Sequence, residues 1–280
     1  MRKQYTDLKI FEKQSIVDLY GADLSWIHNL VFNQYNKIVH LSNAIHLPEI
    51  IDLSRAEYID LSFTDLKNVK TLLLNSNARY IQLSNVSSLS GTLNLDKVES
   101  LYCKNINLAS VKIIFNPHAK KINLAFARNA TGILDFGNVQ EICLASVDLS
   151  KVESLKLNPN ANLINLSGSR GLSGTLYFNN VAALYLNFAN LSAVSEIKFN
   201  KHAARIDLAA STGLKGVLDF GYTRLVNLRN ADLSKVTRII CGANTNLKDL
   251  PMNWCGEIVR LGATLNKNLQ LVKGEAHKGR

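Results

Sequence analysis

Three side chains in the first quarter of the chain could do chemistry if folding brought them together. They are Asp18, His40 and Asp60, which follow one another at intervals of about 20 residues. Two carboxylates flanking an imidazole can bind a divalent metal ion or serve as an acid–base set. The same side chains can instead form a ladder of opposite charges on the solvent face of a sheet, which is the interpretation we favour. The elements that carry them decide between the two.

Those elements repeat along almost the whole chain. One series of apolar residues recurs about every 21 residues: Phe11, Phe32, Leu53, Leu74, Leu95, Phe115, Phe136, Leu157, Phe178, Phe199, Phe220, Cys241 and Leu261. A second series alternates between steps near 22 and near 20: Leu19, Leu41, Leu61, Leu83, Cys103, Leu124, Leu144, Leu166, Leu186, Leu208, Leu228, Leu250 and Leu271. The two steps together define a superrepeat of about 42 residues. Such regularity predicts a solenoid of stacked coils.

Nearly every member of both series has an apolar residue two positions earlier, such as Val39 before Leu41 and Leu134 before Phe136. This spacing puts both side chains on one face of a strand. The sequence therefore predicts a mainly β solenoid of about thirteen coils and about 60 Å in length, with two parallel strand segments in each coil. The solenoid should span residues 7–271, between an N-terminal tail (residues 1–6) and a basic C-terminal tail (residues 272–280).

The residue just before each member of the second series should point outward. This column is predicted to contain Asp18, His40, Asp60, Gln82, Tyr102, Asn123, Cys143, Asn165, Tyr185, Asp207, Asn227, Asp249 and Gln270. Lys248 should then occupy an inward slot, which a charged side chain tolerates only where no further coil covers it. Asparagines that follow the first series at the superrepeat spacing, such as Asn75 and Asn158, are suited to closing turns.

Two stretches resemble the leucine-rich repeat. Tyr80-Ile81-Gln82-Leu83-Ser84-Asn85 precedes Leu89-Ser90-Gly91-Thr92-Leu93, and Leu163-Ile164-Asn165-Leu166-Ser167 precedes Leu172-Ser173-Gly174-Thr175-Leu176. Alternation of about 20 and 22 residues is similar to the short bacterial members of that family. The resemblance implies a leucine-rich-repeat-like solenoid that binds another protein, as bacterial effectors and intracellular adaptors do.

Tyrosines gather on the same predicted sheet. Tyr20, Tyr58, Tyr80 and Tyr102 should lie at or beside outward strand positions of the N-terminal half. Exposed tyrosines are common in protein-binding surfaces, although tyrosine also suits exposed strand positions by propensity alone. We therefore predict a partner-binding face whose members are Asp18, Tyr20, His40, Tyr58, Asp60, Tyr80, Gln82 and Tyr102.

Other functions have weaker support in the sequence. The formal net charge of +10 makes binding to nucleic acid or an anionic membrane a second alternative, without a recognisable nucleic-acid motif. No phosphate-binding loop, nucleophile motif or Cys/His metal spacing is found, so we expect a protein without enzymatic activity, metal or cofactor. An enzyme or metal-binding protein using Asp18, His40 and Asp60 stays as the first alternative.

The context of the protein is less constrained. The sequence shows no long apolar span and no signal peptide, so we expect a cytoplasmic protein or one exported by another route. Bare solenoid ends can stack, which leaves a monomer or an end-to-end dimer as the expected state.

Overall fold

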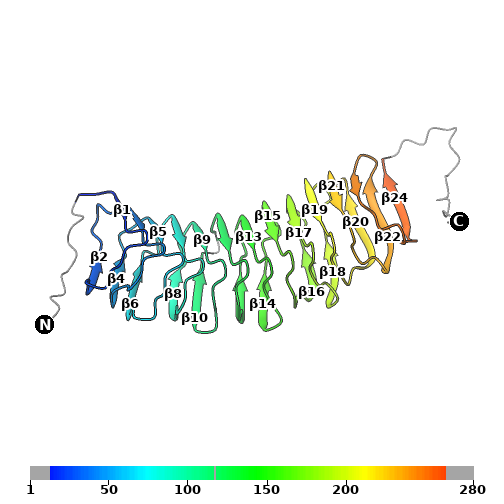
Figure 1. The fold of residues 1–280 in the computed structure, drawn as a ribbon. Helices are drawn as coiled ribbons and strands as arrows, with labels where there is room; N and C mark the ends of the chain where they lie inside the picture. The colour runs from blue at the N-terminus through cyan, green and yellow to red at the C-terminus, as the bar shows by residue number, and fades with distance from the viewer. Residues whose placement is uncertain (1–12, 117, 263–280) are drawn as a thin grey trace, which may run out of the picture.

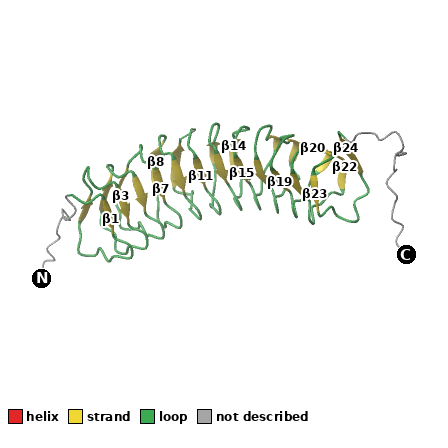
Figure 2. Cartoon of the chain, turned by 90° about the horizontal axis from the view of Figure 1, so that it is seen from above, coloured by secondary structure: helices red, strands yellow, loops and turns green. Residues whose placement is uncertain are grey.

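The chain forms a parallel β-solenoid of about 12 turns, which curves gently along its length (Figures 1 and 2). The structure is a computed structural model in which residues 13–116 and 118–262 are described. Strands and turns make up the described residues, and no helix occurs among them. The prediction of a mainly β solenoid with parallel strands is confirmed. The proposed tails, and the last predicted rung at Leu271, lie outside the described residues.

One side of the solenoid is a continuous sheet of twelve parallel strands, which we call the odd sheet because it contains every odd-numbered strand. Its strands are β1 (Ile16–Asp18), β3 (Ile38–His40), β5 (Tyr58–Asp60), β7 (Tyr80–Gln82), β9 (Ser100–Tyr102), β11 (Lys121–Asn123), β13 (Glu141–Cys143), β15 (Leu163–Asn165), β17 (Ala183–Tyr185), β19 (Arg205–Asp207), β21 (Leu225–Asn227) and β23 (Asn246–Lys248). All twelve pair in register without a bulge, so equivalent residues form straight columns.

The opposite side carries the even-numbered strands, which do not form one sheet. These strands are β2 (Asn29–Val31), β4 (Ile50–Leu53), β6 (Thr71–Leu74), β8 (Gly91–Leu95), β10 (Val111–Phe115), β12 (Gly132–Asp135), β14 (Val152–Lys156), β16 (Gly174–Tyr177), β18 (Val194–Lys198), β20 (Lys215–Gly221), β22 (Lys235–Gly242) and β24 (Glu257–Leu261). They pair as β2-β4-β6, β8-β10, β12-β14, β16-β18 and β20-β22-β24.

Aromatic rings cross two of the gaps between these small sheets. The rings of Phe115 and Phe136 lie 5.5 Å apart between centroids, at the boundary between β10 and β12. The rings of Phe199 and Phe220 lie 5.0 Å apart at the boundary between β18 and β20. Phe136 and Phe220 are fully buried. Packing inside the solenoid therefore holds these coils together where strand pairing stops.

The core includes most described members of the two apolar series identified in the sequence and the apolar residues two positions before them. Members of the second series from Leu41 to Leu228 are buried, with Cys103 in place of leucine in one coil. In the first series Phe136, Phe178 and Phe220 are among the largest fully buried side chains. Burial of these columns removes apolar surface from water at every rung, which is the main driving force for stacking.

The outward column of the odd sheet is confirmed from Asp18 to Asn227, and it is wrong in the last coil. Lys248, not Asp249, pairs with Asn227, and Leu247 pairs with the buried Val226. Lys248 is exposed accordingly. The apolar residue that follows β21 in the core is therefore Leu247, and the predicted inward position of Lys248 does not occur.

Asparagine side chains join successive coils on the even side of the solenoid. Asn75, Asn116, Asn158 and Asn200 each donate a side-chain hydrogen bond to a backbone carbonyl of the preceding coil, at 2.8 to 3.0 Å. Each also accepts a hydrogen bond from the backbone N–H two residues later. The predicted turn role of these asparagines is confirmed, and they bind the neighbouring coil as well.

None of the described residues belongs to a helix that is long and apolar enough to cross a membrane.

We expect Asn158→Ala to lower the free energy of unfolding by about 1–3 kcal/mol. Asn158 is 4% exposed and donates to the Val139 carbonyl at 3.0 Å, so the substitution leaves that buried acceptor without its donor. Urea denaturation followed by circular dichroism measures the change. Asn179→Ala, at an exposed position, is the matched control and should stay within about 0.5 kcal/mol of wild type. Equal effects of both substitutions would contradict the structural role of Asn158.

Acid should destabilise the solenoid through four aspartates that cap equivalent turns. The pKa of Asp23 is lowered mainly by the Ser25 backbone N–H, and the pKa values of Asp65, Asp148 and Asp232 mainly by serine hydroxyls. Because these folded-state pKa values are depressed, their contribution is present above the unfolded value of about 3.9 and is lost as pH falls through the folded values.

Replacing all four aspartates by asparagine should flatten this pH dependence. Asn107 and Asn190 already cap the equivalent turns of other coils, so the fold accommodates the amide. The urea midpoint of the variant, measured between about pH 5 and pH 2, should fall less than that of wild type. Parallel profiles for the two proteins would show that these carboxylates do not carry the acid sensitivity.

Candidate functional site

Two outward columns cover the N-terminal half of the odd sheet. The first column consists of Ile16, Ile38, Tyr58, Tyr80 and Ser100. The second consists of Asp18, His40, Asp60, Gln82 and Tyr102. Strand geometry produces this arrangement because the middle residue of each strand points into the core and the residues on either side of it point outward. An apolar column thus runs beside a polar one across five strands, and we call this surface the N-terminal face.

Three tyrosines of the N-terminal face contact one another. The Tyr58 and Tyr80 rings are stacked, with centroids 6.4 Å apart and planes 24° apart. Tyr80 and Tyr102 are closer, with centroids 5.0 Å apart and planes tilted by 37°. Tyr102 belongs to the second column and pairs in register with Gln82, so Tyr80 reaches it diagonally. The three rings form a continuous aromatic patch that crosses from one column to the other.

Charged side chains border this aromatic patch. The Lys121 ammonium lies 5.5 Å from the centre of the Tyr102 ring and 3.1 Å from a carboxylate oxygen of Glu141. The hydrogen bond to Glu141 raises the pKa of Lys121, with a smaller contribution from Tyr102. Burial raises the pKa of Tyr80, as does the proximity of Tyr102. Tyr80 therefore keeps its phenolic proton at neutral pH and can donate a hydrogen bond to a ligand.

The polar column contains the three side chains that could form a metal or acid–base site. Its two carboxylates, however, are engaged in hydrogen bonds within their own turns. Asp18, His40 and Asp60 lie opposite one another on β1, β3 and β5, as predicted. An Asp18 oxygen accepts a hydrogen bond from the Tyr20 backbone N–H at 3.0 Å. An Asp60 oxygen accepts from the Ser62 N–H at 2.8 Å and from its hydroxyl at 2.6 Å. These carboxylates cap the turns after their strands.

Among residues 13–116 and 118–262, no group of three or more His, Cys, Asp or Glu side chains is arranged to hold a metal ion. Tyr20, the remaining predicted member of the face, follows β1 in the turn and is 68% exposed. The structure therefore brings Tyr58, Tyr80 and Tyr102 together and places Tyr20 at the margin of the face.

Two of the four cysteines are poorly placed for nucleophilic chemistry. Cys103 and Cys241 are buried, and burial raises the pKa of both thiols, which keeps them protonated at neutral pH. Cys143 is half-buried in the outward column and Cys255 is exposed. All four thiols are free.

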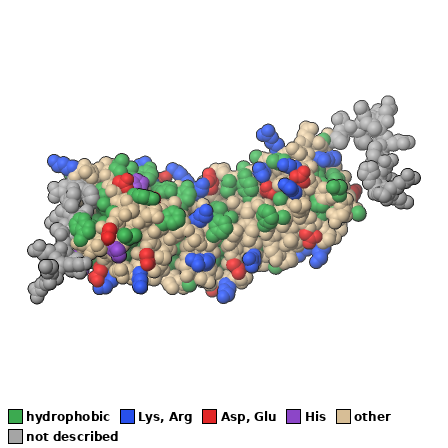
Figure 3. All heavy atoms as spheres, viewed as in Figure 1, with side chains coloured by type: hydrophobic (Ala, Val, Ile, Leu, Met, Phe, Trp, Pro, Cys, Tyr) green, Lys and Arg blue, Asp and Glu red, His purple; other side chains and the backbone are tan. Residues whose placement is uncertain are grey.

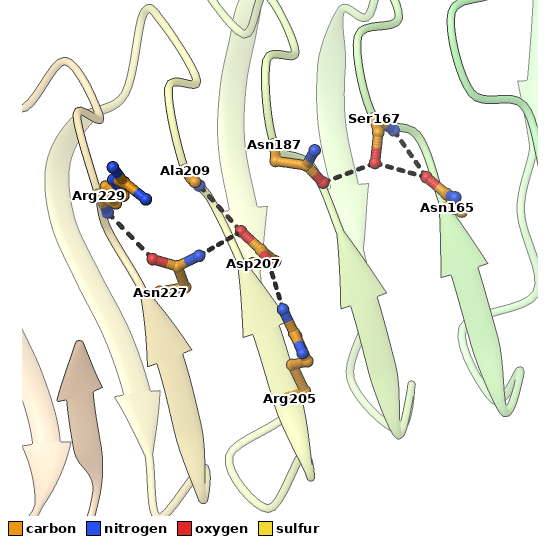
Figure 4. A network of polar contacts seen from close by, with 8 residues as sticks. All are labelled: Asn165, Ser167, Asn187, Arg205, Asp207, Ala209, Asn227 and Arg229. Atoms are coloured by element: carbon orange, nitrogen blue, oxygen red, sulfur yellow. Dashed lines mark hydrogen bonds and ion pairs between the residues drawn. The ribbon is translucent and has the colours of Figure 1, made fainter. Parts of the chain in front are cut away.

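A second polar cluster on the odd sheet was not predicted as a site (Figure 4). The Arg205 guanidinium donates to Asp207 at 2.7 Å and lies 5.3 Å from the centre of the Tyr185 ring. Asp207 is 6% exposed and also accepts from the Asn227 amide at 3.1 Å. The signal for this cluster was an Arg and an Asp two positions apart in one strand, which places both side chains on the same face. Its hydrogen bonds link β19 to β21 and stabilise the sheet.

Exposed apolar side chains are not confined to the odd sheet. On the face drawn in Figure 3, hydrophobic side chains are interspersed with Lys and Arg along the length of the solenoid. Exposed hydrophobic residues of the even strands include Val31, Leu73, Ile114, Ile133, Tyr177 and Val217. They are distributed over five separate small sheets, whereas the N-terminal face is a single continuous surface.

No protein-family model, curated protein or solved structure matches this chain. The functional argument therefore depends on the geometry of these surfaces.

The contact between Tyr80 and Tyr102 should be measurable as a coupling free energy. We expect a double-mutant cycle with Tyr80→Leu and Tyr102→Leu to give about 0.5–1.5 kcal/mol of coupling in urea denaturation, because the ring centroids are 5.0 Å apart. A cycle that combines Tyr80→Leu with Tyr177→Leu, on the opposite side of the solenoid, should be additive within about 0.5 kcal/mol. Additivity in the first cycle would show that the aromatic patch is not formed in solution.

Proposed function

We propose that the protein is a non-enzymatic recognition module that binds another protein through the N-terminal face. The observation that carries this proposal is the aromatic patch of Tyr58, Tyr80 and Tyr102, continuous with the exposed Ile16 and its neighbour Ile38. Tyrosine supplies a large contact area, little rotamer entropy to lose and a hydroxyl that can hydrogen-bond at the rim.

The rigidity of the face supports binding. The strands β3, β5, β7 and β9 beneath it have a parallel partner on both sides, and the edge strand β1 pairs with β3. Corner residues continue the inter-coil bonds, as when the Leu41 N–H donates to the Asp60 carbonyl at 2.8 Å. A surface ordered before binding loses little conformational entropy when a partner docks. The partner we expect presents apolar side chains to the Ile16–Tyr80 column and polar groups to the Asp18–Gln82 column.

The leucine-rich-repeat resemblance is part of the same proposal. Its support is the alternation of coils, which the structure expresses in capping residues at the superrepeat spacing, including Asp23, Asp65, Asp148, Asn190 and Asp232. On that resemblance we propose an intracellular adaptor or a bacterial effector.

Affinity capture tests the proposed function. Tagged wild-type protein, incubated with bacterial and with eukaryotic lysates, should retain a partner from one of them. A Tyr58→Ser, Tyr80→Ser, Tyr102→Ser variant should lose that partner while keeping its circular dichroism spectrum, because the side chains point outward from strands whose cores are unchanged. The matched control is Tyr35→Ser, Tyr177→Ser, Tyr222→Ser, which removes three exposed tyrosines outside the N-terminal face.

Retention of the partner by the control and its loss by the first variant would support the proposal. Equal capture by wild type and both variants, or capture from neither lysate, would reject the N-terminal face as the binding surface.

A further inference from the structure

One corner of the solenoid contains a column of residues in the left-handed backbone conformation. It follows the odd strands, at the edge toward which all of them point (Figure 1). Its members are Gly21, Asn43, Phe63, Asn85, Asn105, Phe126, Ser146, Gly168, Phe188, Ala210 and Asn230, all with φ between 52° and 65°. Glycine and asparagine tolerate this conformation best, and they occupy six of the eleven positions. We call this column the corner column.

Three phenylalanines occupy positions of the corner column at which glycine or asparagine would be preferred. Phe63, Phe126 and Phe188 have φ of 58°, 60° and 60°. Their side chains are 60%, 48% and 69% exposed. A bulky side chain in this conformation costs about 1–2 kcal/mol of stability, and an exposed ring recovers little of it by burial.

The fold does not need these rings, because the backbone alone holds the corner. The N–H groups of Phe63, Phe126 and Phe188 donate to carbonyls of the next coil at 3.0, 2.7 and 2.8 Å. Asn43 and Gly168 make the same bond at 3.0 and 2.8 Å with a residue better suited to the conformation. Backbone strain that no packing or hydrogen bond of the side chain offsets is typical of functional positions.

The phenylalanines are spaced regularly along the corner. Two members of the corner column separate Phe63 from Phe126, and two others separate Phe126 from Phe188. Each interval is therefore three coils, or about 14 Å at a strand spacing of about 4.8 Å. The corner residues between the last two rings are Ser146, with a short side chain, and Gly168, with none.

Cationic side chains lie beside Phe126 and on the coils between it and Phe188. The Lys104 ammonium lies 5.4 Å from the centre of the Phe126 ring. A shallow pocket beside Phe126 is lined by Arg128 and Lys151, among other residues. Arg170 is exposed two coils after Arg128, on the coil before Phe188, and its backbone pairs with that of Asp148 in an isolated β-bridge equivalent to that between Asn107 and Arg128.

Carboxylates also occur at this corner, and those of Asp60, Asp65 and Asp148 are engaged in local hydrogen bonds. Asp148 accepts from the Ser150 N–H at 2.9 Å, and its pKa is lowered mainly by that serine's hydroxyl. Asp65 accepts from the Ser88 hydroxyl at 2.8 Å and from the Lys67 N–H at 3.1 Å. Along this corner, on the described coils from Lys104 to Arg170, the four cations Lys104, Arg128, Lys151 and Arg170 therefore outnumber the single turn-capping carboxylate, that of Asp148.

We propose that the corner column binds single-stranded nucleic acid, with bases stacked on Phe63, Phe126 and Phe188 and phosphates near the four cations. Flat apolar rings at regular intervals, interleaved with positive charge, match a polymer that alternates planar bases and anionic phosphates. A bilayer would attract the same side chains but would not require equal spacing, and a protein partner would not require the cations. Folding creates this pattern, because residues 63, 104, 126, 151, 170 and 188 come from six different coils.

Fluorescence anisotropy with labelled oligo-dT and oligo-U of about 15 nucleotides tests the proposal. Wild type should bind both, and should bind a duplex of the same length more weakly because its bases are already stacked. The logarithm of the association constant should fall with the logarithm of salt concentration with a slope of about −3, as expected for four phosphates on a single strand.

Two sets of variants separate stacking from charge. Phe63→Asn, Phe126→Asn, Phe188→Asn should weaken binding by at least about five-fold per ring and leave the salt slope unchanged. The same variant should melt at or above the wild-type temperature, because asparagine suits the left-handed conformation. Arg128→Ser with Arg170→Ser should reduce the magnitude of the slope by about 1.4.

Several results would overturn the proposal. One is wild type that binds neither oligonucleotide, and another is binding that the phenylalanine variant retains in full. A preference for the duplex would also reject stacking. Cosedimentation with phosphatidylserine vesicles that depends on the three phenylalanines, without oligonucleotide binding, would assign the corner to a membrane surface instead.

Discussion

Hydrogen bonding between successive coils of the odd sheet is the constraint on which the rest of the structure depends. Each coil donates to and accepts from its neighbours in the same register along all twelve strands. Because side chains alternate between the two sides of a strand, a slip of one residue would turn the buried leucines to water. That penalty keeps every column straight, so the core, the N-terminal face and the corner column all follow from one backbone pattern.

Columns of this kind can be predicted from sequence where only one alignment of a strand with its neighbour places apolar residues in the core. We call each such alignment a frame. From Asp18 to Asn227 the spacing allows a single frame, and the outward column is correct throughout. The last coil has leucine at both 247 and 250, so the sequence allows two frames. Only the pairing of Leu247 with Val226 decides between them, and that pairing depends on the packing of β23.

Features that depend on side-chain orientation or backbone conformation, rather than on the spacing of residues in the sequence, were harder to predict. The outward positions of Tyr58, Tyr80 and Tyr102 follow from alternation, but their ring contacts depend on a diagonal reach from Tyr80 to Tyr102. The left-handed conformation of Phe126 could not be inferred from an apolar residue type, which in a repeat sequence usually indicates the core. Asp18 and Asp60 have the residue type that a metal or acid–base site requires, but the structure shows that each carboxylate caps a turn.

The difference between the two sides of the solenoid has a mechanical consequence. The odd sheet is an unbroken series of hydrogen bonds, so stretching it would break pairing at some rung. The even strands form five separate small sheets, and between them the coils can move apart without losing a strand pair, at the expense of ring packing and of turn hydrogen bonds such as that from the Asn180 N–H to the Pro159 carbonyl at 2.9 Å. The molecule should therefore behave as an elastic beam with one inextensible side. Bending about that side changes the spacing of the even strands and leaves the spacing of the tyrosine-bearing columns constant.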